Sequence, residues 1–384
     1  MDNRPRAVFC WLVRGRFLTT AGVACLIFGL LHSASGQLPL SPLQPGWLPT
    51  ELAANRQYVG GKVCLSCHPA QSKYSGAAMA TALRAGSAQG ILSAHSELTF
   101  ERPPFVYRIE RQGDQSIYTV TNGLETVSTP ILWAFGRGEI GQTFVIDLDG
   151  KFQEARVSYF TALDDLDWTL GTPANFDPQT VTEAAGRPLD DQEVRRCFGC
   201  HATGAVQNSV VTLPHMEPGI SCEGCHGPGD KHVQSISSGN RDEAGMGRMK
   251  SMTAEQQADF CGSCHRTWAE VAAQKIKGVD NVRFQPYRLV NSKCYDPDDA
   301  RIRCAACHDP HEDPSRDARF YDDKCLACHA GGEATAAAAT GPACPVGTQE
   351  CSTCHMPKVD VPGAHYAFSD HTIRIVRPGA PYPN

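Results

Sequence analysis

Seven copies of one five-residue pattern, Cys-x-x-Cys-His, are the residues best suited to chemistry in this chain of 384 residues. They use 14 of the 18 cysteines, and a histidine directly follows every pair. Two thiols three positions apart on a helical turn can bond to the vinyl groups at one porphyrin edge, and the adjacent imidazole can bind the iron. This pattern is therefore the attachment signature of c-type haem, and we predict seven covalently attached haem c groups.

The predicted cofactor-binding residues are the two cysteines and the histidine of each motif. They are Cys64, Cys67 and His68; Cys197, Cys200 and His201; Cys222, Cys225 and His226; Cys261, Cys264 and His265; Cys304, Cys307 and His308; Cys325, Cys328 and His329; and Cys351, Cys354 and His355. The seven histidines are the expected proximal iron ligands. Cysteine pairs can also bind zinc, act as dithiol redox centres or form disulfides, but none of those uses requires the histidine that follows every pair here.

The second axial position of each iron needs a distal ligand. Outside the motifs and the first 36 residues, six histidines are candidates: His95, His215, His232, His311, His365 and His371. Six histidines cannot serve seven irons, so at least one iron takes a methionine, another atom or a partner protein's histidine, or stays open. Met79, shortly after the first motif, is the methionine that we favour.

Two candidate distal ligands lie too close in sequence to their own motif to reach the opposite face of that haem. His311 follows His308 by three residues, and His232 follows His226 by six residues across a Gly-Pro-Gly turn. We therefore expect each of them to serve an adjacent iron.

Residues 1–36 have the features of a secretory signal peptide. Four arginines precede an uncharged, mostly apolar run, and Ala34 and Gly36 are small residues before a cleavage point. An uncleaved anchor would need about 20 apolar residues, and a lipoprotein signal at Cys25 conflicts with the apolar sequence after it. We expect an exported protein, periplasmic or extracellular, with no membrane span in the mature chain.

The composition of the chain bears on the class of molecule that it binds. The net charge of -6 and the 20% of charged residues argue against nucleic-acid binding, so redox protein partners are expected instead. An oxidising compartment also favours a disulfide between Cys294 and Cys344 over two free thiols.

The motifs divide the chain into five expected parts. These are the signal peptide 1–36, a Pro-rich linker 37–57, a first haem-binding segment 58–96, a β-rich insert 97–170 and a six-haem cytochrome domain 171–384. The insert should contain two hairpins, one turning at residues 112–114 and one at Asp149-Gly150, which is a strong two-residue turn signal. The small-residue stretch 75–90 is predicted to be helical.

The density of motifs predicts the fold class. The half of the chain from Cys197 onwards holds six motifs, which leaves too little chain for a large side-chain core as well. We predict a mostly α and irregular multihaem cytochrome c fold with stacked haems as its core, plus a small β-rich insert.

Residues 58–380 resemble the multihaem cytochrome c superfamily. This group includes the cytochrome c-554-like tetrahaem carriers of ammonia oxidisers, pentahaem nitrite reductases and octahaem hydroxylamine oxidoreductases. The resemblance lies in Gly219–Gly229, in Cys304–His311, in Cys351–Lys358 with Asp370 and His371, and in Phe135–Gly138. It implies a multihaem architecture.

The chain also departs from these relatives. All seven motifs end in histidine, whereas the nitrite reductases have a lysine there at the catalytic haem, and the eighth haem motif of the octahaem enzymes is missing. Where relatives carry a histidine after the first motif, this chain has Gly76, Ala77 and Ala78, so the resemblance gives no distal ligand for the first haem.

Electron transfer between redox partners is the predicted function, and no catalytic residue is assigned. The alternative is an oxidoreductase that acts on a small nitrogen or sulfur compound at one five-coordinate haem, and the shortage of histidines motivates it. A third hypothesis is a subunit of a self-assembled or larger redox complex, in which a partner supplies the missing histidine.

Overall fold

The computed structural model describes residue 49 and residues 56–87, 90–240, 245–247, 249–329, 344–377 and 379–383. The expected signal peptide and nearly all of the expected linker lie outside the described residues, as does the side chain of His215. Within the described part of the chain, no helix is both long and apolar enough to cross a membrane.

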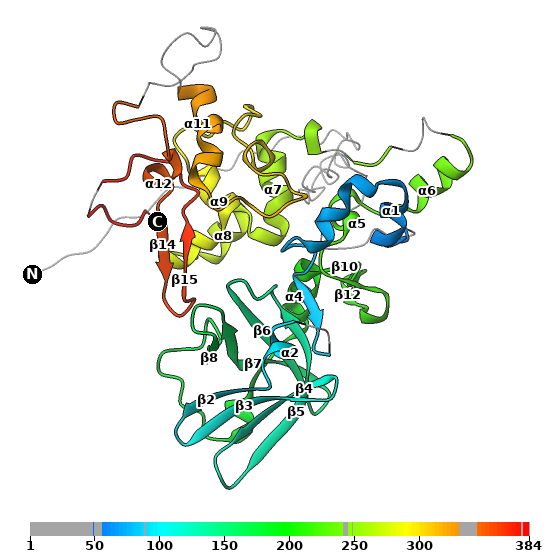
Figure 1. Ribbon diagram of the computed structural model, residues 1–384, viewed down its shortest axis with the longest axis vertical. Coiled ribbons are helices and arrows are strands. Elements are labelled where there is room, and N and C mark those ends of the chain that lie inside the picture. Colours follow the sequence, from blue (N-terminus) through cyan, green and yellow to red (C-terminus); the bar gives the residue numbers. More distant parts are fainter. Residues whose placement is uncertain are drawn as a thin grey trace, which may run out of the picture. The chain divides into compact units, whose positions relative to one another are not determined.

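Nine strands form one antiparallel sheet in this part of the chain. Strands β2 to β8 are neighbours in sequence order (Figure 1). In addition, β1 pairs with β5, and β9 pairs with β7. Their bounds are β1 Leu83–Ala85, β2 Glu97–Arg102, β3 Phe105–Gln112, β4 Gln115–Thr121, β5 Thr126–Phe135, β6 Gly141–Leu148, β7 Lys151–Phe160, β8 Asp165–Trp168 and β9 Gly186–Pro188. The sheet curls so that its two end strands approach each other. The ring centroids of Trp168 on β8 and Phe100 on β2 are 5.1 Å apart.

Both predicted hairpins are confirmed. Gln112 pairs with Gln115 across the β3–β4 turn, and Leu148 pairs with Lys151 across the β6–β7 turn. In the second turn Asp149 has φ 56° and Gly150 has φ 75°. Positive φ at both central residues matches the right-handed twist of the flanking strands, which explains why an Asp-Gly pair turns here.

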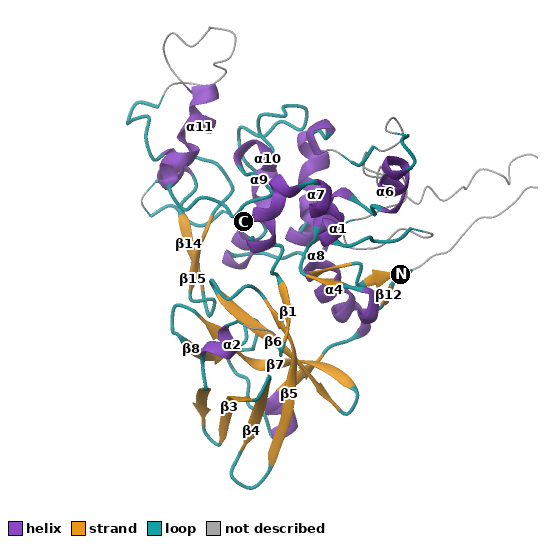
Figure 2. Cartoon of the chain, turned by 45° about the vertical axis from the view of Figure 1, so that its right-hand side comes forward, coloured by secondary structure: helices purple, strands orange, loops and turns teal. Residues whose placement is uncertain are grey.

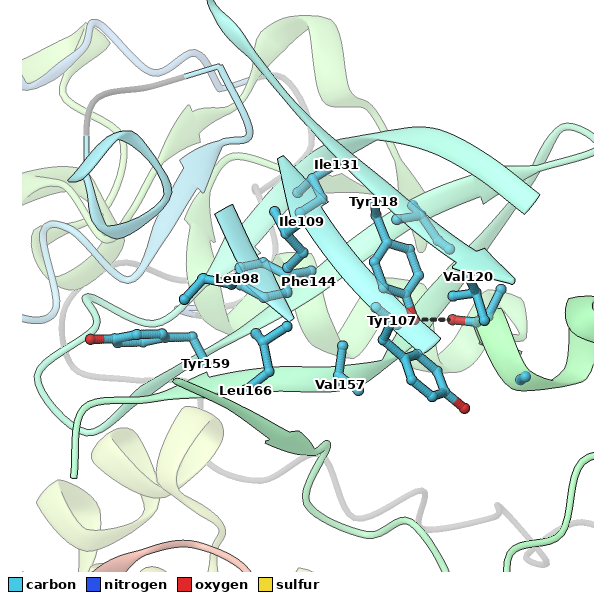
Figure 3. Packing of buried hydrophobic residues seen from close by; sticks show 14 of the residues in the cluster. Leu98, Tyr107, Ile109, Tyr118, Val120, Ile131, Phe144, Val157, Tyr159 and Leu166 are labelled. Atoms are coloured by element: carbon cyan, nitrogen blue, oxygen red, sulfur yellow. Dashed lines mark hydrogen bonds between the residues drawn. The ribbon is translucent and has the colours of Figure 1, made fainter. Parts of the chain in front are cut away.

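The sheet encloses a side-chain core of aromatic and aliphatic residues (Figure 3). Alternation along the strands builds it, since Phe105, Tyr107 and Ile109 of β3 are buried while the intervening Arg108 is exposed. The hydroxyl of Tyr118 donates a 3.0 Å hydrogen bond to the carbonyl of Ala185, so this polar tip is satisfied inside the core.

The expectation of a small β-rich insert is wrong, because the sheet is a major part of the structure. It extends beyond residues 97–170 at both ends through β1 and β9. The predicted helix over 75–90 is also wrong: a 3-10 helix ends at Gly76, and Leu83–Ala85 is a strand. Backbone hydrogen bonding to β5 decides this conformation, since tertiary context overrides the weak propensity of small residues.

Every Cys-x-x-Cys-His motif has its cysteines on a helix, and the motif helices are α1, α4, α5, α7, α10, α11 and α12 (Figure 1 and Figure 2). The helix bounds are α1 Gly61–Cys67, α2 Ile91–Ala94, α3 Val181–Ala185, α4 Asp191–His201, α5 Cys222–His226, α6 Asp230–Ser237, α7 Ala254–His265, α8 Trp268–Gln274, α9 Gln285–Val290, α10 Cys304–Cys307, α11 Asp322–His329 and α12 Cys351–His355.

Short elements connect these helices. The 3-10 helices are η1 Pro69–Gly76, η2 Leu213–His215, η3 Met249–Ser251, η4 Val279–Arg283 and η5 Ala318–Tyr321. Three two-stranded pairs are formed by β10 Ala202–Thr203 with β13 Glu217–Pro218, β11 Val206–Gln207 with β12 Val210–Val211, and β14 Lys358–Val361 with β15 Tyr366–Ser369.

The motif helices differ in how they begin. Helices α4 and α7 start with capping boxes, formed by Asp190 with Glu193 and by Thr253 with Gln256. Helices α5, α10 and α12 have four or five residues and no side-chain cap from the residue before them. Isolated helices of that length are unstable in water, so contacts from elsewhere in the chain must hold them.

Candidate haem-binding sites

The motif helices approach one another through their cysteines. All described cysteines are free thiols. Four pairs of thiols lie close enough to shift each other's pKa: Cys64 with Cys222, Cys200 with Cys264, Cys261 with Cys304 and Cys325 with Cys351. The first motif therefore adjoins the third, the second adjoins the fourth, the fourth adjoins the fifth, and the sixth adjoins the seventh. Cys225 also lies near Cys264, and Cys325 lies near Cys307. The seven motif helices are therefore linked in one branched cluster, in which the fourth motif adjoins the second, third and fifth.

Three motif histidines face an imidazole from elsewhere in the chain. The ring centroids are 6.3 Å apart for His68 and His232, 6.1 Å for His226 and His311, and 6.2 Å for His308 and His371. We refer to these as the three imidazole pairs. In each pair the second histidine follows a different motif in sequence, so the structure places His232 beside His68 rather than beside His226.

The spacing of the three imidazole pairs fits two axial ligands of one iron. A metal–imidazole bond is about 2 Å long and a ring nitrogen lies about 1 Å from its centroid, so two imidazoles on opposite faces of one metal ion have centroids about 6 Å apart. The observed separations of 6.1–6.3 Å match that value. With paired thiols on the same helices, the donor set fits covalently attached haem.

Hydrogen bonds at Nδ1 orient four histidine rings, two of which belong to the imidazole pairs. The Nδ1 atoms lie 3.1 Å from the carbonyl of Ala82 for His201, 3.0 Å from that of Gly247 for His226, 2.9 Å from that of Arg374 for His355 and 3.0 Å from that of Ser369 for His371. A carbonyl can only accept, so Nδ1 carries the proton and Nε2 keeps the lone pair that binds a metal. Backbone acceptors have no sequence signature, and sequence reasoning missed them.

Two candidate distal histidines make other contacts. His95 uses both ring nitrogens, at 2.9 Å from the carbonyl of Ile91 and at 3.1 Å from Asp164 Oδ1. His365 has Nε2 at 2.8 Å from Asp167 Oδ2, and its ring packs on Phe160. Among the ring contacts of the described residues, neither histidine faces a motif histidine.

For the two remaining candidate ligands, His215 and Met79, the structure gives only their place in the fold. His215 ends η2, and its side chain is outside the description. Met79 is half-buried in the turn after η1, where its carbonyl accepts a 2.9 Å hydrogen bond from the backbone N–H of Ile220.

Burial keeps several of the imidazoles neutral. Desolvation lowers the pKa of His201, His265 and His308 below the ordinary value of 6.5, and it lowers the pKa of His371 to about 4. Because the charged ring loses more hydration energy than the neutral ring, burial favours the neutral form. Only the neutral imidazole binds a metal.

The second motif packs directly on the β-sheet. Phe198, between the two motif cysteines, is buried against Trp133 and Phe135 of β5 and Phe152 of β7, with ring centroids 5.4–6.0 Å away. The ring of His201 meets the edge of Phe135 at 5.2 Å. The sheet therefore positions one attachment helix by aromatic packing.

A buried ion pair centred on Asp370 holds residues 370–374 in place. Asp370 accepts hydrogen bonds from Arg288 at 2.8 Å and 2.9 Å and from Arg374 at 2.6 Å. Asp370 precedes His371 of the third imidazole pair, and the carbonyl of Arg374 accepts from His355. Residues 370–374 thus connect the fifth and seventh motifs. Sequence reasoning noted Asp370 only as part of a resemblance and missed Arg288, because the two lie far apart along the chain.

The expected disulfide between Cys294 and Cys344 is not present in the structure. Both are free and exposed. Cys294 instead lies within electrostatic range of Cys328 in the sixth motif, and residues 330–343, which lead to Cys344, are outside the description.

Comparisons with known proteins agree with the interpretation of the motifs as haem-binding sites. Residues 174–227, which contain the second and third motifs, match the family model described as cytochrome c554 and c-prime. The chain is also 27% identical over 186 residues to the multiheme cytochrome MtrA of Shewanella baltica strain OS185. That alignment covers 48% of this chain and 47% of the relative, so about half of each protein is compared. No solved structure matches. The chain is thus a multihaem c-type cytochrome that carries a cytochrome c554-family domain and is distantly related to MtrA.

Proposed function

We propose that this cytochrome transfers electrons between redox protein partners through seven covalently bound haem c groups. The three imidazole pairs carry the proposal. At such a pair, both imidazoles would bind the iron and leave no open position for a substrate, which is typical of electron carriers. Haem bound at these sites supplies reversible one-electron redox chemistry.

The chain's own residues would fix the spacing and the ligation of the cofactors. Each motif contributes two thiols and one imidazole, and His232, His311 and His371 contribute the second imidazole at three sites. The proximity of thiols in neighbouring motifs supports a continuous, branched network of closely spaced sites. Electron transfer needs such proximity, and it needs no acid or base group.

Export belongs to the same proposal. Attachment of haem to cysteine takes place outside the cytoplasmic membrane, and residues 1–36 have the pattern of a signal peptide. We propose a periplasmic or extracellular protein whose partners are other redox proteins, including a larger redox complex.

One observation favours an oxidoreductase as a second candidate. His95 and His365 hydrogen-bond to Asp164 and Asp167, which leaves fewer imidazoles for the seven irons than the sequence offers. An iron with an open sixth position could reduce or oxidise a small nitrogen or sulfur compound.

Electron paramagnetic resonance of the oxidised protein, with haem content measured on the same sample, separates the two functions. We expect seven haems per chain and low-spin signals. The variant His232→Ala should keep seven haems and convert one iron in seven to another ligation state, whereas His95→Ala should leave the spectrum unchanged. Fewer than seven haems, or no spectral change in His232→Ala, would contradict the proposed ligation. A high-spin signal in the unmodified protein that shifts with nitrite or hydroxylamine would favour the oxidoreductase.

A further inference from the structure

The third motif contains a glutamate, Glu223, whose side chain is fully buried. Its carboxylate accepts hydrogen bonds from three backbone N–H groups, at 2.9 Å from Val59, 2.8 Å from Gly60 and 2.7 Å from Gly229. None of these donors belongs to the third motif. Glu223 therefore connects its own helix to two other segments of the chain.

Two of these donors stand at the starts of the helices that present one imidazole pair. Gly60 directly precedes α1, which carries the first motif, and Gly229 directly precedes α6, which carries His232. His68 follows the last residue of α1, and its ring faces that of His232 at 6.3 Å. One carboxylate thus anchors both elements that bring these two imidazoles together.

Helix electrostatics explains why a carboxylate serves here. The first N–H groups of a helix have no partner within the helix and carry partial positive charge. Both α1 and α6 begin after a glycine that offers no side-chain acceptor, and Glu223 supplies one. A second carboxylate strengthens the same link, because Asp230 accepts from Arg56 Nε at 2.8 Å and from the N–H of Gln57 at 3.1 Å.

The close approach also depends on Gly229. A Cβ atom at this position would lie 3.0 Å from the side chain of Val59 and 3.1 Å from Glu223 Oε1. Both separations are tighter than ordinary contacts, so a larger residue requires Val59, Glu223 or the start of α6 to shift by a few tenths of an ångström.

The same arrangement recurs at two other pairs of motifs. Gln257 on α7, beside the fourth motif, accepts a 2.7 Å hydrogen bond from the N–H of Ala305 in the fifth motif. Asp322 on α11, beside the sixth motif, accepts from Glu350 at 2.8 Å and from Cys351 at 2.9 Å, where the helix of the seventh motif begins. Gln257 and Asp322 are buried like Glu223. In all three cases the first cysteines of the two motifs are also neighbours, close enough to shift each other's pKa.

We propose that Glu223 is a positioning residue for both axial imidazoles at the first motif, although it belongs to the third. Buried acceptors on one motif helix thus cap a neighbouring motif helix, and the attachment sites are assembled in pairs. This inference rests on the proposed haem ligation of His68 and His232.

The test is the full-length, haem-loaded variant Glu223→Gln. The amide keeps the size of the side chain but has one acceptor oxygen, and its NH₂ group faces backbone donors. We expect haem content equal to that of the wild type and a changed electron paramagnetic resonance signal that amounts to one iron in seven. The new signal should coincide with that of His232→Ala, whose altered iron is at the first motif.

Two controls locate the effect. Glu255→Gln changes an exposed glutamate on α7 and should leave the spectrum unchanged, and His311→Ala gives the signal of an altered iron at the third motif. If Glu223→Gln resembles His311→Ala or the wild type, the inference is overturned while the proposed function stands. If Glu223→Gln does not accumulate, Gly229→Ala takes its place: a His232→Ala type of signal supports the inference, and a wild-type spectrum overturns it. If the spectrum of His232→Ala itself does not change, the proposed ligation of one iron by His68 and His232, on which this inference rests, is refuted.

Discussion

The nine-stranded sheet and the region that contains the motif helices, called the helical region below, bury different kinds of side chain. The sheet core consists of aromatic and aliphatic residues such as Tyr107, Phe144 and Val157, all with no exposed surface. In the helical region the hydrophobic clusters are small, and one has Met252 as its only buried member among the described residues. Every buried charged side chain of the described chain lies in the helical region: Glu223, Arg288, Asp322 and Asp370.

This difference indicates two ways of holding a chain together. Apolar burial is non-directional and contributes about 25 cal/mol per Å², which suits a sheet that needs only a compact interior. The helical region has short helices with unsatisfied N–H groups, and buried acceptors from neighbouring motifs satisfy them in directed contacts. The sheet should therefore fold on side chains alone, whereas the helical region should depend on its attached haems.

The largest effect is expected from a variant that removes one haem, because it should unfold the helical region and leave the sheet folded. In Cys304→Ala/Cys307→Ala, we expect six haems per chain, because the fifth motif can no longer bond to its porphyrin. Hydrogen exchange should then show loss of protection in the helical region and continued protection in β3 to β7. The matched control is Cys294→Ala, which lies outside the motifs and should keep seven haems. Seven haems and unchanged protection in the double variant would refute the dependence on haem.

A smaller effect is expected from the reverse experiment. Phe144→Ala removes a fully buried ring from the sheet core and should lower the free energy of unfolding of the sheet by about 3–5 kcal/mol. Haem content and the spin state of the irons should not change. Leu124 is 94% exposed, so Leu124→Ala should change stability by less than about 0.5 kcal/mol. Chemical denaturation followed by far-ultraviolet circular dichroism measures both, and loss of haem in Phe144→Ala would show that the regions are not separable.

The smallest expected effect compares two kinds of helix cap. Thr253 caps its own helix, α7, from an exposed position. Thr253→Ala should cost about 1 kcal/mol of stability and leave the iron signals unchanged, in contrast to Glu223→Gln. An altered iron signal in Thr253→Ala would mean that any weakening of a motif helix disturbs ligation, and the special role of buried acceptors would be lost.

The parts of the fold that could be predicted from the sequence are those set by a few neighbouring residues. The two hairpin turns were predictable because Gly113-Asp114 and Asp149-Gly150 act over a few residues. Strand β1 was not, because Leu83–Ala85 has no strand signal of its own and depends on β5. The size of the sheet was underestimated for the same reason, since β9 also joins from outside the strand-rich stretch.

The sequence by itself determined the chemistry of the cysteines and motif histidines, because the Cys-x-x-Cys-His spacing is a local property of one helical turn. Only the tertiary structure decided which imidazole faces which motif. His68 meets His232, and Glu223 meets Gly60, across more than 160 residues of chain. Such contacts depend on how the whole chain folds back on itself, and neither residue type nor spacing along the sequence contains that information.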